Sequence, residues 1–253
     1  MNSNSRVLVI GDSCIDQFVY GTSMRLCPDG PVPVFSPLET VEVGGMAENT
    51  KANIISLNHT CDIITHPEQI YKTRYVDKKT NHMFIRVDTG ETHIKRIKNI
   101  DVSKLHQYGA IAISDYNKGF LHEEDVQFIC ENHPLVFVDT KKHIGSFCEN
   151  ATFIKINELE YNISKHILSS PIYADKLIVT LGSRGCRYMD KIFPVDDTEV
   201  KDMSGAGDTF LAGLIQKYLS TKCIIEAIKH ANFCATKVVQ KRGVTVIADT
   251  DLI

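Results

Sequence analysis

The residues best suited to chemistry lie in one glycine-rich segment, Val200–Phe210 (VKDMSGAGDTF). Its turn, Gly205–Gly207, precedes an apolar stretch that predicts a helix beginning near Asp208 and running to about Leu219. Backbone amides at a helix start favour an anion, and glycine lets the backbone approach it closely. An aspartate there cannot attract a phosphate. We therefore expect Asp208 to remove a proton from a nucleophile that attacks a phosphoryl group.

The same segment has a plainer interpretation, a glycine turn in which Asp208 is an ordinary N-cap. Two better-known phosphate loops do not apply. The chain has no GxxxxGK[ST] motif, and Phe210 stands where GxGxxG needs its third glycine. The phosphate hypothesis therefore depends on which other polar residues the fold brings to this turn.

The elements that must position these residues follow an alternating β-α pattern. Helical stretches at Glu123–Asn132 and Asn157–Leu168 separate short β-branched runs, which predicts an α/β domain with a parallel sheet buried on both faces. A final helix is expected at Ile224–Lys241. The predicted strands are Arg6–Ile10, Ala110–Ile113, Leu135–Val138, Thr152–Ile156 and Lys176–Thr180.

Polar side chains close most of these predicted strands. Ligands in open α/β sheets bind outside the carboxyl ends of the strands. We therefore expect the polar residues to meet at one edge of the sheet. They are Asp12, Ser114, Asp115, Asp139, Asn157 and Thr180.

Two segments depart from this pattern and alternate in polarity, Gln17–Val43 and Tyr71–Ile97. Both read as exposed antiparallel strands, which would form a small β-sheet lid beside the main sheet. No linker or repeat divides the chain, so residues 1–253 are predicted to form one domain with the lid inserted.

Composition narrows the classes of protein further. A net charge of −3 gives no basic field for nucleic acid or an anionic membrane, and 43% hydrophobic residues exclude a disordered chain. The apolar runs are too short to span a bilayer. Eight scattered cysteines without a CxxC pair indicate free thiols, so a cytoplasmic location is expected.

The glycine-rich segment resembles a known signature. Asp202–Phe210 is similar to the D-x-[ST]-G-A-G-D-x-F signature of the ribokinase-like (PfkB) carbohydrate kinases, and Val43–Asn49 (VGGMAEN) resembles the sugar-binding GG…N signature of that family. The resemblance extends from about Val7 to Val246. It implies a ribokinase-like three-layer α/β/α sandwich with a mostly parallel central sheet. Further segments in family order are Ser114–Gly119, Val138–Lys141, Asn157–Glu160 and Val179–Gly185.

One branch of the family fits best. Gly11–Asp16, Arg25–Val34 and Ile85–Asp88 resemble the heptose-7-phosphate kinases, which occur alone or as the kinase half of a bifunctional ADP-heptose synthesis enzyme. The resemblance implies ATP-dependent phosphorylation of the anomeric hydroxyl of D-glycero-D-manno-heptose 7-phosphate. The HxGH motif of the nucleotidyltransferase half does not occur, so a single-function kinase is expected.

The resemblance also implies roles for individual residues. Asp208 is the base, and Gly205, Ala206 and Gly207 form the anion hole. Asn157 and Glu160 match the NxxE motif that organises Mg²⁺ largely through water. Substrate-binding residues are Asp12, Asp16, Gly44, Gly45, Asn49, Arg86, Asp115 and Lys118. Nucleotide-binding residues are Lys141, Asn157, Thr180, Gly182, Gly185 and Asn232. A monovalent cation site near Gly243–Val246 is also possible in this family.

Plainer interpretations of these residues stay open at this point. The acids and Asn157 could cap turns and helices, the cations could be solvated, and Asn232 could lie on a helix surface. Three departures bear on the substrate: three residues separate Gly45 from Asn49, as in ribokinases; Glu48 is acidic; and Lys155-Ile156 replaces a small residue and a proline. The chain is also short for the family, with the shortfall placed between Asn58 and Tyr71.

The alternatives are a kinase for another sugar or a nucleoside, and a catalytically silent sugar- or nucleotide-binding relative. The expected partners are a sugar phosphate and ATP, with no nucleic acid and no membrane. A homodimer through the lid is expected, because the lid carries apolar residues that need cover. These are Val34, Phe35, Val41, Phe84 and Ile85.

Overall fold

A central sheet of eight strands organises the computed structural model, which describes residues 6–251. The outermost residues of the 1–253 unit, 1–5 and 252–253, lie outside the described residues. The strand order is β12-β11-β10-β9-β8-β7-β1-β4. Its pairings are parallel except for β10–β11 and β11–β12, which are antiparallel. The strands are β1 (Arg6–Gly11), β4 (Thr60–Ile64), β7 (Ala110–Asp115), β8 (Val136–Thr140), β9 (Phe153–Asn157), β10 (Leu177–Thr180), β11 (Cys186–Tyr188) and β12 (Lys191–Phe193).

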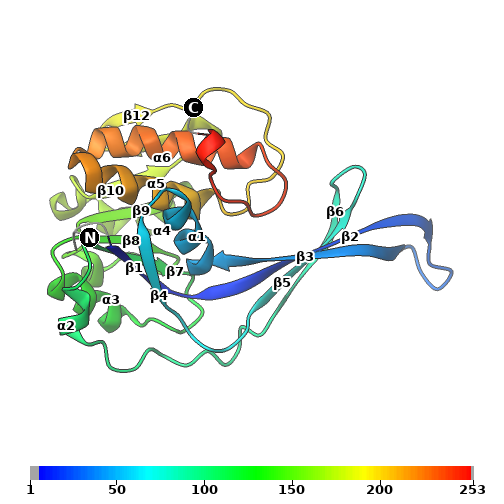
Figure 1. Cartoon of the computed structure of the whole chain (residues 1–253), viewed down its shortest axis with the longest axis horizontal. Helices are drawn as coiled ribbons and strands as arrows, with labels where there is room; N and C mark the ends of the chain where they lie inside the picture. The colour runs from blue at the N-terminus through cyan, green and yellow to red at the C-terminus, as the bar shows by residue number, and fades with distance from the viewer. Residues whose placement is uncertain (1–5, 252–253) are drawn as a thin grey trace.

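Helices cover both faces of this sheet (Figure 1). In β1, Val7 and Val9 face one apolar cluster while Leu8 and Ile10 face another, as period-2 alternation requires. The first cluster is closed by α1 (Ala47–Ser56), α5 (Ala206–Thr221) and α6 (Ile224–Val239). The second is closed by α2 (Val102–Leu105), α3 (Glu123–Asn132) and α4 (Glu158–Leu168). The predicted three-layer α/β/α sandwich is therefore confirmed.

A second sheet of four strands extends from the carboxyl side of the main sheet, and it is the lid (Figure 1). Its order is β3-β2-β5-β6, with β2 (Ser13–Leu26), β3 (Pro33–Met46), β5 (Tyr71–Asp77) and β6 (Met83–Thr89). The prediction of antiparallel strands throughout is wrong at one pairing, because β2 and β5 are parallel. After β3 the chain passes through α1 and β4 and re-enters the lid in the direction of β2.

The element boundaries agree closely with the sequence prediction in the main layers. α3 spans the predicted residues, and β1 and β7–β10 match the predicted runs to within one or two residues. α5 begins at Ala206, two residues early, and the last lid strand ends at Thr89 rather than near Ile97. The short β11 and β12 were not predicted. Four 3₁₀ turns complete the described chain: Ser146–Cys148, Pro171–Tyr173, Gly182–Arg184 and Asp249–Asp251.

The sheet register brings the polar strand ends together. Gly11 pairs with Ser114, Ser114 with Asp139, and Asp139 with Lys155. At the next strand, Asn157 pairs with Thr180. The expected convergence of polar residues along one sheet edge is thus observed. Among the helices of the described residues, none has the length and apolar character needed to cross a membrane.

Candidate active site

Asp208 lies at the centre of the site, in the first turn of α5. Gly205 caps this helix with φ 78°, a left-handed conformation that favours glycine. Asp208 is 2% exposed. Its Oδ2 accepts a hydrogen bond of 2.9 Å from Asn49 Nδ2, and its Oδ1 accepts a hydrogen bond of 2.7 Å from the Tyr116 hydroxyl. Burial raises the pKa of Asp208 to about 6, although both hydrogen bonds lower it. A carboxylate with that pKa can act as a base near neutral pH.

Asn49 joins the two sequence signatures in space. Its Nδ2 also approaches the Gly205 carbonyl oxygen at 3.4 Å, and Asn53 Nδ2 donates to its Oδ1 at 3.1 Å, which orients the amide. A Cβ on Gly205 would lie 2.5 Å from Asn49 Nδ2, so this contact needs a glycine. The GG…N segment and the GAGD turn therefore form one site.

A buried ion pair that sequence reasoning missed borders the same turn. Lys155 Nζ lies 2.5 Å from Asp139 Oδ2, and both side chains are almost fully buried. A Cβ on Gly207 would lie 2.9 Å from that ammonium, which places the charge directly against the expected anion hole. The sequence signal was the lysine inside the apolar run Phe153–Ile156.

Lys141, Asn157 and Glu160 form a second polar group at this edge. Asn157 and Glu160 cap α4 reciprocally, and Glu160 Oε1 accepts bonds from Asn157 Nδ2 at 2.7 Å and Lys141 Nζ at 2.5 Å. Burial lowers the pKa of Lys141, but Asp139 and Glu160 raise it more, so the ammonium stays charged. The capping interpretation and the NxxE interpretation are thus both compatible with the geometry.

Two of the residues expected to bind nucleotide, Gly185 and Asn232, lie at the Phe193 carbonyl group. Asn232 on α6 is buried, rather than on the helix surface, and its Nδ2 donates to the Phe193 oxygen at 2.8 Å. A Cβ on Gly185 would lie 2.0 Å from the same oxygen, and Gly182 and Gly185 both have positive φ. Thr180 ends β10 just before this turn. The structure therefore brings these four residues to one end of the sheet.

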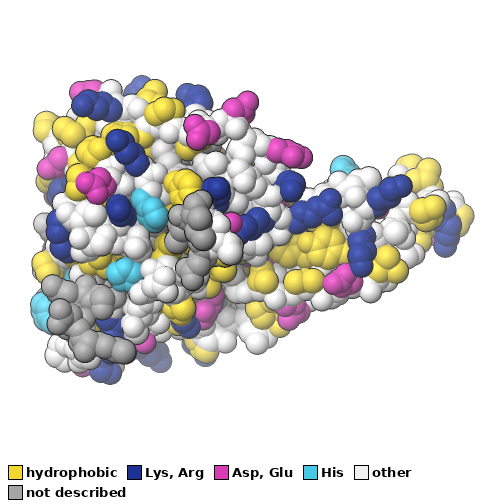
Figure 2. All heavy atoms as spheres, turned by 45° about the horizontal axis from the view of Figure 1, so that its top comes forward, with side chains coloured by type: hydrophobic (Ala, Val, Ile, Leu, Met, Phe, Trp, Pro, Cys, Tyr) yellow, Lys and Arg dark blue, Asp and Glu magenta, His cyan; other side chains and the backbone are white. Residues whose placement is uncertain are grey.

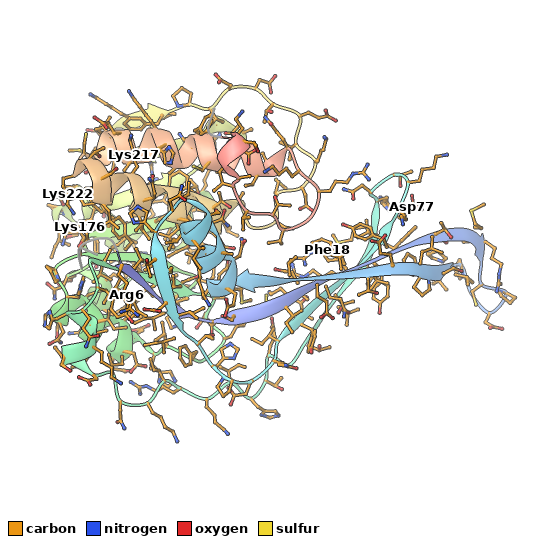
Figure 3. All side chains as sticks on the ribbon, in the orientation of Figure 1. Arg6, Phe18, Asp77, Lys176, Lys217 and Lys222 are labelled. Carbon is orange, nitrogen blue, oxygen red and sulfur yellow. The ribbon has the colours of Figure 1, made fainter. Side chains whose placement is uncertain are left out.

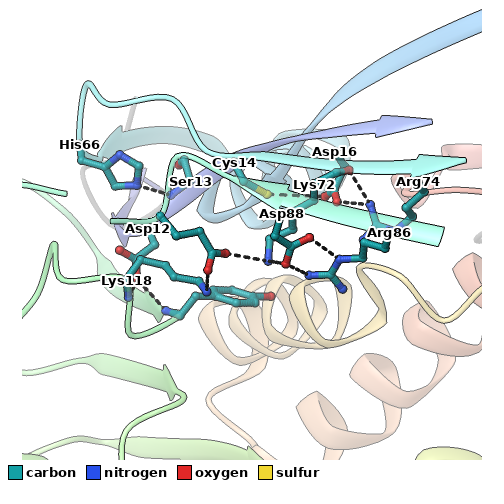
Figure 4. Close-up of polar contacts among 12 residues, drawn as sticks. Asp12, Ser13, Cys14, Asp16, His66, Lys72, Arg74, Arg86, Asp88 and Lys118 are labelled. Atoms are coloured by element: carbon teal, nitrogen blue, oxygen red, sulfur yellow. Dashed lines mark hydrogen bonds and ion pairs between the residues drawn. The ribbon is translucent and has the colours of Figure 1, made fainter. Parts of the chain in front are cut away.

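On the lid side, two buried aspartates lie at the start of β2. Asp12 Oδ2 accepts the backbone N–H groups of Tyr116 at 2.8 Å and Lys118 at 3.2 Å, and burial raises its pKa. Asp16 is paired with Arg74 at 2.5 Å (Figure 4). A Cβ on Gly45 would lie 2.0 Å from Asp16 Oδ2, so Gly45 lets this carboxylate reach its position.

Cations from the lid and from the loop after β7 cluster beside these aspartates (Figure 4). Arg86 pairs with Asp88 through two bonds of 2.7 and 2.6 Å. Lys118 Nζ lies 2.6 Å from Glu91, and Lys72 Nζ lies 3.8 Å from Glu91 and 3.9 Å from Asp88. Burial lowers the pKa of Lys72. With Arg74, four cations thus face one region, and two of them, Lys72 and Arg74, were missed by the sequence prediction.

One thiol links the lid cations to the candidate base. Burial raises the pKa of Cys14, and the charges that act on it include Lys72 and Arg74 from the lid and Asp208 from α5. Cys14 also packs against Tyr116 in a small apolar cluster. Cys14 therefore lies within electrostatic reach of both Asp208 and the two lid cations.

Asp115 was expected to bind substrate, but its carboxylate is engaged by neighbouring protein groups instead. Its carboxylate accepts bonds from Lys142 Nζ at 2.8 and 2.7 Å, from the Thr140 hydroxyl at 2.6 Å and from the Asn117 amide at 2.9 Å. These contacts occupy both oxygens and tie β7 to β8. The geometry supports a structural role for Asp115 more than contact with a sugar.

Comparisons with known proteins identify the family of the chain. The family model described as pfkB family carbohydrate kinase matches residues 120–251. The chain is 30% identical over 296 aligned positions to the bifunctional protein HldE of Helicobacter pylori strain J99, and 29% identical over 308 positions to that of Helicobacter hepaticus. The two alignments cover 94% and 100% of this chain but only 63% and 64% of those relatives.

Solved structures agree on the fold. The crystal structure of ribokinase from Thermotoga maritima superposes with a TM-score of 0.76 at 16% identity, covering 97% of both chains. Arabidopsis thaliana ribokinase, complexed with ribose and ATP, gives 0.71 at 13% identity, covering 98% and 97%. At such low identity these similarities establish the ribokinase-like fold and nothing finer.

Proposed function

The chain belongs to the pfkB family of carbohydrate kinases, and from that membership we propose that it transfers the γ-phosphate of ATP to a hydroxyl of a sugar phosphate. The observation that carries the proposal is the buried Asp208 carboxylate, held by Asn49 and Tyr116 at the start of α5. A base and a helix N-terminus that favours anions lie side by side there, as phosphoryl transfer to an alcohol requires.

The proposed reaction uses this chain's groups in distinct ways. The acceptor hydroxyl lies against Asp208, which takes its proton as the oxygen attacks the γ-phosphorus. The amides at Gly205–Gly207 stabilise the charge on the transferring group, and each such donor contributes about 3–4 kcal/mol in comparable sites. Thr180, Gly182, Gly185 and Asn232 border the nucleotide.

Magnesium is part of the proposal, because ATP-dependent kinases use it to neutralise phosphate charge. Glu160 fits a loosely held Mg²⁺: it offers hard carboxylate oxygens and is 12% exposed, so waters can reach it. Asn157 orients that carboxylate through its amide. Within residues 6–251, no three acidic, histidine or cysteine side chains gather as a metal cage.

The substrate class rests on four cations beside the sugar-side aspartates, namely Lys72, Arg74, Arg86 and Lys118. Asp16, Asp88 and Glu91 pair with them in the structure, and the phosphate of a sugar phosphate would take the place of one or more of these carboxylates. Arginine binds a phosphate monoester bidentately, and Arg86 already holds Asp88 in that way. The similarity to the HldE proteins favours D-glycero-D-manno-heptose 7-phosphate, phosphorylated at the anomeric hydroxyl.

A substrate panel tests this proposal. ADP release, measured by a coupled assay, is expected with heptose 7-phosphate and to be much slower with ribose, fructose or adenosine. Turnover of an unphosphorylated sugar or nucleoside, with none of the sugar phosphate, would replace the proposed substrate by the alternative. Nucleotide binding without transfer to any acceptor would favour the silent relative.

A homodimer through the lid is the proposed assembly. Hydrophobic side chains gather along the projecting lid, with basic side chains beside them (Figure 2). Ile85 is 56% exposed and Val41 39%, although both lie in strands. A second copy of the lid is the proposed cover, because exposed apolar strands otherwise favour aggregation.

Eight free cysteines, six of them buried, support the proposed cytoplasmic location.

A further inference from the structure

Lys155 is a buried charge with no part in the proton transfer to Asp208 or in the binding of the sugar. It lies on β9 between apolar neighbours, and its side chain is only 5% exposed. The β8–β9 register pairs it directly with Asp139, so the two side chains share one face of the sheet. A buried ion pair is weak evidence for stability, because hydrophobic residues of the same size often stabilise as well. Stability alone therefore does not explain this pair.

Charged groups of both signs surround the Lys155 ammonium: Asp139 pairs with it, and the buried Asp208 carboxylate interacts with it as well. The ammonium lies against Gly207, at the α5 N-terminus, which itself carries partial positive charge. Lys141 adds a second ammonium near Asp139. Because Lys141 is itself paired with Glu160, the positive groups that adjoin the Gly207 turn are the Lys155 ammonium and the helix N-terminus.

The ammonium also has hydrogen-bonding capacity to spare. A lysine head group has three donors, and the one hydrogen bond found for Lys155 Nζ among the described residues goes to Asp139. Gly207 keeps the approach open, since a Cβ there would lie 2.9 Å from Nζ. The free donors therefore lie next to the backbone amides of the turn.

We propose that Lys155 binds the phosphoryl group during its transfer and that Asp139 is the positioning residue that holds its ammonium at the Gly207 turn. The inference rests on the proposed kinase function. As the acceptor oxygen bonds to the γ-phosphorus, its proton passes to Asp208. The bond from that phosphorus to the bridging oxygen breaks, and ADP leaves with the bridging oxygen. Lys155 keeps its protons throughout and stabilises the transferring oxygens as a point charge.

Lys155→Met tests this, with binding and turnover measured separately. Wild type is expected to bind the non-hydrolysable analogue AMP-PNP more tightly than ADP in calorimetry. The variant should lose about tenfold or more of its AMP-PNP affinity and keep its ADP affinity. Its kcat should fall by about a hundredfold or more, with the sugar phosphate KM little changed.

Lys155→Met leaves Asp139 buried and unpaired and can fail to fold, so Asp139→Asn/Lys155→Met is the second variant. It should show the same selective loss. The matched control is Lys176→Met: Lys176 bonds the Glu149 carbonyl at the amino end of β10, far along the strand from the turn, and is labelled in Figure 3. Its turnover and affinities should match wild type.

An unchanged ratio of AMP-PNP to ADP affinity, with kcat within about threefold of wild type in either variant, would overturn the proposal. A purely structural Lys155 would lower both affinities together and would overturn it too. Failure of the proposed function would give a different result, because wild type itself would then turn over no sugar phosphate. The ratio of AMP-PNP to ADP affinity is measured without an acceptor, so it tests Lys155 separately.

Discussion

The hydroxyl of Tyr116 donates a 2.7 Å hydrogen bond to Oδ1 of Asp208, so a residue that follows β7 directly supports one at the start of α5. The Tyr116 side chain is half-buried, and its desolvation beside Asp208 raises the pKa of its phenol well above the usual value. Tyr116 therefore remains a donor at neutral pH. It stabilises the ionised carboxylate, which is the form that a general base needs.

The pH dependence of the reaction should reflect this contact. Burial raises the pKa of Asp208 to about 6, so kcat/KM is expected to fall as the pH drops through about 6. Tyr116→Phe removes a bond that lowers this pKa, so the acidic limb should move to higher pH. Tyr188→Phe is the control, because it removes a hydroxyl that donates at 2.8 Å to the Asp175 carbonyl, away from the site. A limb unmoved by Tyr116→Phe would argue against Asp208 as the titrating base.

Gly45 allows a second prediction, on the sugar side. In Gly45→Ala the new Cβ would lie 2.0 Å from Asp16 Oδ2 and 2.6 Å from Cys14 Sγ, so Asp16 must shift and weaken its pairing with Arg74. The KM for sugar phosphate should rise about tenfold or more, because a charged hydrogen-bonding group is misplaced, while ATP affinity stays the same. Gly30→Ala, where nothing lies within 4 Å of the new Cβ, should behave as wild type. Equal KM values in the two variants would exclude a role for Asp16 in sugar binding.

The lid predicts a measurable assembly. Wild type should have the mass of a dimer in light scattering at micromolar concentration, and Ile85→Lys should shift it toward the monomer by placing a charge in the buried contact. Ile192→Lys is the matched control, because Ile192 is 59% exposed on β12 at the far edge of the main sheet. A monomer mass for wild type at this concentration would contradict a dimer through the lid.

The main layers of the fold were predictable because their signals are local. Continuous β-branched runs marked β1 and β7–β10, and the helical stretch between two of these runs marked α3 with its observed bounds. The direction of the β2–β5 pairing was not predictable. Alternating polarity reports which face is buried, and it carries no information on the neighbouring strand.

The same limit explains which site residues were missed. The GAGD turn and the GG…N segment carry recognisable motifs, so Asp208 and Asn49 were found. Lys155 and Asp139 lie sixteen positions apart, and only the register of β8 against β9 pairs them. Lys72 and Arg74 read as polar positions of an exposed strand, yet both are buried beside Asp16. Their function depends on contacts that no local pattern records.

The central claim is that Asp208 is the base of a kinase acting on a sugar phosphate. The most direct measurement follows ATP and D-glycero-D-manno-heptose 7-phosphate by ³¹P NMR, with wild type and Asp208→Asn side by side. Wild type should produce ADP and a second sugar-phosphate resonance. Asp208→Asn should lower that rate by about a thousandfold while calorimetry finds its ATP affinity unchanged. Near wild-type turnover by Asp208→Asn, or no second resonance with wild type, would contradict the account.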